Sequence, residues 1–173
     1  ELQQPPGSDA SITSQIVKIE GQGRNPLSSA QGVGQFTNQT WLDTVKSARP
    51  DLAQGKTDTD ILALRNDPNL AWQMTDALRK QNVSYLQSKG LPTTPGAQYL
   101  AHFLGPKGAE GVLGADPNTP VSDALGKAVG PTRAAQMIAA NPTVLGGKQV
   151  GSLTQWADNK MGGAHGDSLY DVL

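Results

Sequence analysis

Residues 67–92 read DPNLAWQMTDALRKQNVSYLQSKGLP, and this stretch decides the fold class. Asp67 is a good helix cap, and Pro68 stands at the first helical position, where its missing N–H costs nothing. Six residues then recur at helical spacing and form one stripe: Leu70, Met74, Ala77, Leu78, Gln81 and Tyr85. Gly90 and Pro92 end the pattern. The stretch therefore predicts a long helix with one buried face.

The rest of the chain repeats this arrangement on a shorter scale. Gly and Pro recur every 10 to 20 residues, and the stretches between them carry helical spacing. No pair of alternating apolar stretches flanks an Asn-Gly type of turn, so no hairpin is expected. Further helices are expected at 11–20, from Thr37 or Asn38 to just before Pro50, at 60–66, from Thr94-Pro95 to Gly105-Pro106, and at 107–113, 120–128, 131–140 and 150–161. The sequence predicts an all-α fold.

The length of 173 residues suits one domain that encloses a sizeable core. Residues 1–10 (ELQQPPGSDA) are rich in Pro, Gly and polar side chains, and we expect a flexible lead-in there. The domain is expected to cover 11–161. Residues 162–173 (GGAHGDSLYDVL) are expected to form a mobile tail.

Composition argues against nucleic acid binding, cysteine chemistry and a membrane-spanning helix. Lys and Arg number 14 and Asp and Glu 15, which argues against nucleic acid as the main partner. There is no cysteine, so neither a disulfide nor a cysteine-ligated metal is possible. No apolar stretch approaches the roughly 18 residues that a membrane-spanning helix needs.

Glu20 is the most informative single residue. In the expected helix 11–20, Ser11 can act as the cap, and Ile12, Ile16 and Ile19 follow helical spacing. Glu20 lies four residues after Ile16, on the buried face and in the last turn, where the helix dipole presents negative charge. Burial and the dipole should both raise its pKa above the usual value of about 4.3. A carboxyl group that stays protonated near neutral pH suits cleavage of a glycosidic bond. The alternative is an ordinary glutamate at the surface end of a helix.

The segment after Glu20 is rich in glycine: residues 21–41 read GQGRNPLSSAQGVGQFTNQTW. Gly32 and Gly34 allow a substrate to approach the backbone closely, and Gln35 can donate and accept hydrogen bonds, as an N-acetyl group requires. An ordinary tight turn is the alternative. A dinucleotide-binding loop is excluded, because no strand pattern precedes the glycines.

These residues resemble the catalytic region of the lytic transglycosylases, which share the goose-lysozyme-like fold. The resemblance is carried by Glu20, Asn25-Pro26, Ser28-Ser29-Ala30, Gly32, Gly34-Gln35-Phe36 and Thr40-Trp41, in the variant that reads S-S-A-x-G-x-G-Q-F followed by T-W. The stretch LRNDPNL at 64–70 also resembles the start of the family's next long helix. The resemblance covers roughly 11–145, is strongest at 16–42, and implies a lysozyme-like helical domain.

The resemblance implies roles for individual residues. Glu20 takes the place of the catalytic glutamate, and Gln35 that of the glutamine that contacts the sugar N-acetyl group. The serine of the loop falls on Ser28 or Ser29, with Ser29 favoured, and Phe36 completes this part of the expected substrate-binding set. The sequence departs from the family at Gly21, where a serine often follows the glutamate. The loop between Glu20 and Asn25 is also short.

A second segment, 99–106 (YLAHFLGP), takes the place of the family's aromatic segment that ends in Gly-Pro. Its usual Tyr-Asn pair appears as His102-Phe103, so the family's usual partner for one substrate hydrogen bond is replaced. Tyr99 or His102 is expected to replace that bond. The alternative for His102 is a satisfied core histidine. Since the other histidine, His165, lies in the tail, a metal site is not expected.

Other candidate chemistries are weaker. No G-x-S-x-G elbow is present, which argues against a Ser-His-Asp triad. The tryptophans can stack on sugar rings, although a core position is favoured for Trp41 and Trp72, and Trp156 is left open.

The implied function is cleavage of the β-1,4 bond between N-acetylmuramic acid and N-acetylglucosamine in peptidoglycan, with formation of 1,6-anhydro-N-acetylmuramic acid and no cofactor. The glycan strand is the implied partner, and the implied location is the periplasm or cell envelope, including secretion or phage delivery. A hydrolytic muramidase is the nearest alternative, for which a second carboxylate would come from Asp43, Asp51, Asp58 or Asp60. A non-catalytic peptidoglycan-binding or scaffold module is the alternative from another class.

Overall fold

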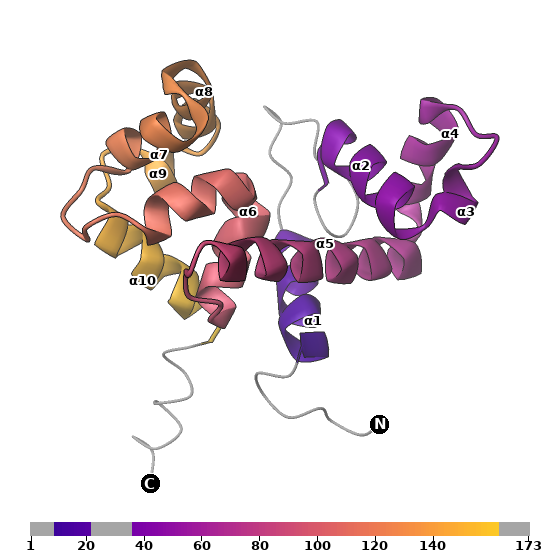
Figure 1. The fold of residues 1–173 in the computed structure, drawn as a ribbon, viewed down its shortest axis with the longest axis horizontal. Coiled ribbons are helices and arrows are strands. Elements are labelled where there is room, and N and C mark those ends of the chain that lie inside the picture. Colours follow the sequence, from indigo (N-terminus) through magenta and orange to yellow (C-terminus); the bar gives the residue numbers. More distant parts are fainter. Residues whose placement is uncertain (1–8, 22–35, 163–173) are drawn as a thin grey trace, which may run out of the picture. The chain divides into compact units, whose positions relative to one another are not determined.

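The computed structural model describes residues 9–21 and 36–162, and the regular structure in these ranges is helical (Figure 1). The predicted all-α class is therefore confirmed. The helices are α1 (Asp9–Glu20), α2 (Asn38–Ala48), α3 (Pro50–Ala53), α4 (Asp58–Ala63), the short 3-10 helix η1 (Leu64–Asn66), α5 (Pro68–Ser88), α6 (Pro95–Leu113), α7 (Val121–Val129), α8 (Pro131–Ala140), α9 (Pro142–Leu145) and α10 (Val150–Lys160). The chain divides into two compact units, Glu1–Lys80 (unit 1) and Gln81–Leu173 (unit 2), with α5 contributing to both.

Unit 1 encloses an apolar core between α2, α4 and the first half of α5 (Figure 1). Thr37 caps α2, as predicted, by accepting a hydrogen bond from the Thr40 amide. Asp67 likewise accepts hydrogen bonds from the amides of Asn69 and Leu70 and so caps α5. The core cluster consists of Phe36, Trp41, Leu42, Val45, Ile61, Leu70, Ala71 and Met74.

The inward face of α5 differs from the predicted stripe. Leu70 and Met74 are buried as expected, but Gln81 is exposed. Further along the helix the buried positions are instead Thr75, Arg79, Asn82 and Leu86. Three of these four side chains are polar, and a pattern based on apolar residues does not detect them.

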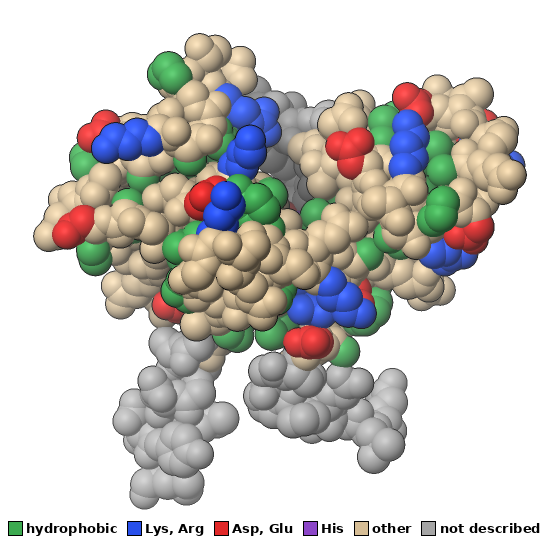
Figure 2. All heavy atoms as spheres, viewed as in Figure 1, with side chains coloured by type: hydrophobic (Ala, Val, Ile, Leu, Met, Phe, Trp, Pro, Cys, Tyr) green, Lys and Arg blue, Asp and Glu red, His purple; other side chains and the backbone are tan. Residues whose placement is uncertain are grey.

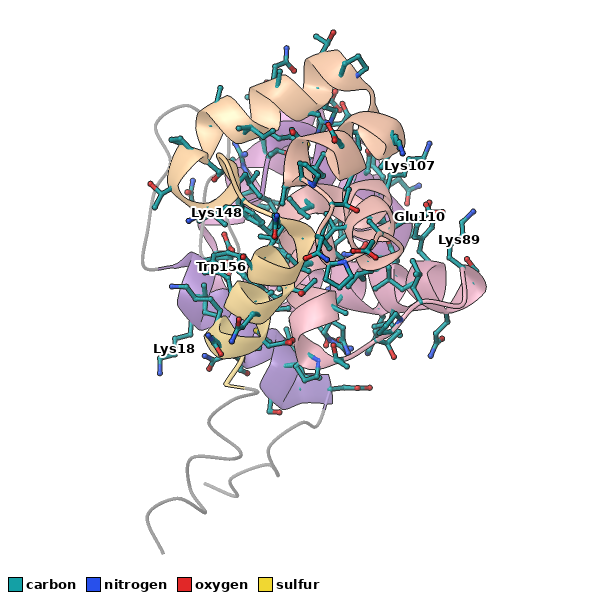
Figure 3. The ribbon with its side chains drawn as sticks, turned by 90° about the vertical axis from the view of Figure 1, so that its left-hand side faces the viewer. Lys18, Lys89, Lys107, Glu110, Lys148 and Trp156 are labelled. Atoms are coloured by element: carbon teal, nitrogen blue, oxygen red, sulfur yellow. The ribbon has the colours of Figure 1, made fainter. Side chains whose placement is uncertain are left out.

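Unit 2 is built around α6, which packs against α10 and α7, while α7 packs against α8. Figure 3 shows α10, which carries Trp156, crossing α6. Thr94 caps α6, and Gly105 interrupts it with φ 78° and ψ 161°, a conformation open essentially to glycine alone. The predicted stop at Gly105-Pro106 is therefore a kink, and the predicted helix at 107–113 forms the second half of α6. Helices α7, α8 and α10 closely match the predicted ones.

Several local predictions are corrected. Ser11 is not a cap, because α1 begins at Asp9, and so Asp9 and Ala10 belong to the helix and not to the lead-in. The sequence pattern does not predict the helices α3 and α9. Pro50, which was expected to follow the end of a helix, and Pro142 each occupy the first position of a four-residue helix. The predicted mobility of the lead-in and tail concerns 1–8 and 163–173, outside the described residues. The single domain remains a prediction.

In the part of the chain that the structure describes, no helix is both long and apolar enough to cross a bilayer. Figure 2 shows Lys and Arg (blue) interspersed with Asp and Glu (red) on the visible face of each unit.

Candidate functional site

Glu20 is the last residue of α1, as the sequence predicts. Helix α1 stops there, and the Gly21 amide still donates to the Val17 carbonyl oxygen at 2.9 Å. The Glu20 side chain is half-buried, and Ile16, one turn earlier on the same face, is completely buried. Glu20 therefore lies where an anchored helix gives way to the glycine-rich segment.

Helix α1 is attached to α5 by buried hydrogen bonds. The Thr13 hydroxyl donates to Asp76 Oδ1 at 2.7 Å, and Arg79 Nε donates to the same hydroxyl at 2.8 Å. Arg79 Nη2 also donates to Asp76 Oδ1 at 3.1 Å, which closes a triangle of side chains. Thr13 is fully buried and the Arg79 side chain is 2% exposed. We call Thr13, Asp76 and Arg79 the Thr13 network.

Two further contacts flank the Thr13 network. Trp72 Nε1 donates to Ser14 Oγ at 3.1 Å, and Arg79 Nη1 lies 3.7 Å from Asp9 Oδ1. Because Trp72, Asp76 and Arg79 are spaced by four and three residues, they share one face of α5. Helix α1 is therefore held at three successive points along that face.

The network sets the charge state of Asp76. Burial raises the pKa of this carboxyl group, but hydrogen bonds from Thr13, Lys80 and Arg79 outweigh burial and bring the pKa below its ordinary value of 3.8. Lys80 Nζ lies 3.0 Å from Asp76 Oδ2. Asp76 is therefore an ionised acceptor near neutral pH.

Phe36 lies at the other end of the glycine-rich segment and is a core residue. Its side chain is 2% exposed and packs edge-on against Trp41, with ring centroids 5.1 Å apart. Its carbonyl oxygen accepts a hydrogen bond from Arg65 Nη1 at 3.1 Å. Direct contact between the Phe36 ring and a substrate would require the core to open, so packing explains this residue better.

Ser29 and Gln35, the other residues predicted to bind substrate in this segment, lie outside the described residues, as do Gly32 and Gly34.

Tyr99 and His102 lie on α6 in unit 2, whereas Glu20 lies in unit 1. The Tyr99 ring is buried and stacks on Phe103 at 6.2 Å, and both rings lie 5.5 Å from the Trp156 ring. His102 and Trp156 are half-buried. In the structure, Tyr99 is thus part of an aromatic cluster that joins α6 to α10.

The tryptophans of unit 1 differ from each other. Trp41 is completely buried and its Nε1 donates to the Ile61 carbonyl oxygen at 2.6 Å, as expected for a core residue. Trp72 is only half-buried.

The carboxylates considered for a hydrolytic mechanism are all exposed. Each accepts a local hydrogen bond: Asp43 from Gln39, Asp51 from Arg49, Asp58 from Lys46 and Asp60 from the Thr57 amide. The hydrogen bond from Arg49 lowers the pKa of Asp51, and the hydrogen bonds from Thr57 lower that of Asp60. Asp51 and Asp58 are thus in ion pairs, Asp60 is part of a helix cap, and Asp43 is hydrogen-bonded to an amide side chain one turn earlier. Among the described residues, no group of three or more His, Asp and Glu side chains is placed to hold a metal ion.

The Thr13 network is not predicted by the apolar pattern of the sequence. One signal was available: Thr13 precedes Glu20 by seven residues, which puts both on the same face of a helix. Asp76 and Arg79 form a pair three residues apart, but nothing in the sequence shows that this pair is buried.

The arrangement on α1 offers one carboxyl group on a fixed helix end, which suits the donation and recovery of a single proton.

Comparisons of the chain with known protein families, with curated proteins and with solved structures find no match.

Proposed function

We propose that this chain is a peptidoglycan lytic transglycosylase with a lysozyme-like fold, and that Glu20 is its acid and base. The observation that carries the proposal is the position of Glu20 at the end of α1, directly before the segment that resembles the family's catalytic region. The anchoring of α1 through Thr13 and the burial of Trp41 at the far end of that segment also support it. Both ends of the segment are thereby attached to unit 1.

In the proposed reaction, Glu20 first gives its proton to the oxygen that links N-acetylmuramic acid to N-acetylglucosamine. The bond from C1 to this oxygen breaks, and the acetamido oxygen of the substrate stabilises the positive charge at C1. The Glu20 carboxylate then takes the proton of the C6 hydroxyl, whose oxygen forms the new bond to C1. One carboxyl group serves both steps because the first step leaves it ionised. The product is a 1,6-anhydro sugar, and no water is consumed.

The test is digestion of purified peptidoglycan sacculi, followed by mass spectrometry of the released fragments. We expect wild-type protein to release fragments that end in anhydro-muramic acid. Glu20→Gln keeps the side-chain size and removes the transferable proton, so it should lower the rate about 10²–10⁴-fold. Asp123→Asn, which neutralises an exposed carboxylate on α7, is the matched control and should retain the wild-type rate.

Fragments that are all heavier by one water would replace the proposal with a hydrolytic muramidase, and Asp43→Asn and its counterparts would then locate the second carboxylate. Protein that binds sacculi but releases no fragments would indicate a binding module. Full activity in Glu20→Gln would remove Glu20 from the mechanism.

A further inference from the structure

We propose that Thr13, Asp76 and Arg79 are positioning residues for Glu20: they fix the rotation of α1 on α5 and thereby the direction of the Glu20 carboxyl group. The consequence for catalysis rests on the proposed function. The consequence for the position of Glu20 rests on the geometry alone.

Thr13 and Glu20 are coupled by the periodicity of the helix. Seven residues separate them, so they differ by only about 20° around the axis and about 10 Å along it. Ile16 lies between them on the same face and is completely buried. Whatever holds Thr13 against α5 therefore determines which way Glu20 faces.

Apolar contacts alone would hold this rotation weakly. Helix α1 has 12 residues, and Ile12 and Ile16 are its buried apolar side chains. Hydrophobic burial is non-directional, so it tolerates small rotations of a short helix. Hydrogen bonds weaken steeply away from linear geometry, and the Thr13 hydroxyl both donates to Asp76 and accepts from Arg79. A slip of α1 by one residue would turn Thr13 by about 100° and break both bonds.

Burial makes such a slip costly. Arg79 is 2% exposed at its side chain, so the loss of its acceptors would leave a guanidinium group unsatisfied away from water. Buried ion pairs are often no more stabilising than apolar residues of similar size, and their best-attested benefit is a unique register. The Thr13 network suits that purpose, because it selects one rotation of α1.

Two substitutions at Thr13, of which the change to Val is isosteric, test the proposal. Thr13→Val removes the bridging hydroxyl, and Thr13→Ser keeps it. The matched control is Thr44→Val: Thr44 is also buried and also donates at 2.7 Å, but to the Thr40 carbonyl oxygen within α2. Both Thr→Val changes remove one buried hydroxyl from unit 1, and only one of them touches the attachment of α1.

The first measurement does not depend on activity. The chain has glutamates only at positions 1, 20 and 110, so ¹³C-glutamate labelling gives three carboxyl-carbon NMR signals. We expect Thr13→Val to shift the Glu20 signal and to leave the Glu110 signal in place. In Thr13→Ser the Glu20 signal should lie close to its wild-type position. Thr44→Val should leave the Glu20 and Glu110 signals unchanged. An unmoved Glu20 signal in folded Thr13→Val, or an equal movement in Thr44→Val, would overturn the proposal. Asp76→Asn, which keeps the shape of the side chain, takes the place of Thr13→Val if that variant does not fold.

The second measurement is turnover of a soluble glycan strand. Misplacement of a reacting group by about 1 Å can cost about 100-fold, so Thr13→Val should lower kcat by at least about tenfold with KM changed less than about twofold. Thr13→Ser should recover most of kcat, and Thr44→Val should retain it. An inactive wild type would refute the proposed function, with the NMR result still deciding the positioning. An active wild type with unchanged kcat in Thr13→Val would refute the positioning alone.

Discussion

Helices α1 and α2 stand at the two ends of the glycine-rich segment, and they are held in opposite ways. Helix α2 is held by apolar burial: Trp41 and Val45 are completely buried in a cluster that includes residues of α4 and α5. Helix α1 buries fewer apolar side chains and relies on the Thr13 network.

The difference separates two physical tasks. Apolar burial supplies free energy of folding in proportion to area but specifies direction weakly. A buried polar network adds little net free energy, because desolvation offsets much of its attraction, but it permits only one geometry. We therefore expect α2 to dominate the stability of unit 1 and α1 to dominate the orientation of Glu20.

The largest expected effect is that of Trp41→Ala. This change removes a completely buried indole and leaves the Ile61 carbonyl oxygen without its donor, so it should lower the free energy of unfolding by about 3–5 kcal/mol. Denaturant unfolding followed by circular dichroism measures this quantity. A loss below about 1 kcal/mol would mean that the apolar cluster does not hold α2.

Arg79→Met should have an intermediate effect. Removal of one partner of a buried ion pair costs about 3–5 kcal/mol, but Asp76 would keep Thr13 and Lys80, so we expect about 2–3 kcal/mol. The same unfolding experiment compares the two variants directly. If Arg79→Met destabilises unit 1 more than Trp41→Ala does, the proposed division between the two helices is inverted.

The smallest effect is the pH dependence of Asp76→Asn. The folded protein lowers the pKa of Asp76, so the ionised carboxylate stabilises the fold at pH values above 3.8, the ordinary pKa of an aspartate. This stabilisation is lost as the pH falls through the pKa that Asp76 has in the folded protein. The neighbouring charged groups are Asp9, Arg79 and Lys80.

Near pH 7 we expect wild type to be more stable than Asp76→Asn, because this change removes the charge closest to the buried Arg79 guanidinium. About 1 kcal/mol of this gap should be lost below about pH 4, as the wild-type carboxylate becomes protonated. Urea titrations of both proteins at several pH values give the gap. A gap that does not change with pH would show that ionisation of Asp76 does not contribute.

Much of the helical fold was predictable from local sequence. The start signals at Thr37, Asp67-Pro68 and Thr94-Pro95 all mark helix caps or first turns in the structure, because capping chemistry is local. The four-residue helices α3 and α9 were missed, since a single turn has no room for a periodic pattern.

The candidate site was predictable to a smaller extent. The position of Glu20 at the helix end follows from the isoleucine spacing and the glycines after it. The burial of Thr13 and Arg79 does not, because hydrophobic periodicity counts apolar residues and assigns polar ones to the surface. The burial of Phe36 does not follow from the motif either, since a motif letter does not tell which side of a chain a ring faces, and its contact with the substrate stays a prediction.

The packing of α10 on α6 has a consequence for biosynthesis. The core residues of unit 1 all precede Lys80, so this core can close early as the chain emerges from the ribosome. Helix α6 must wait for residues up to Lys160, which at about 5–20 residues per second takes about 2–10 s. During that interval the face of α6 that packs against α10 is uncovered.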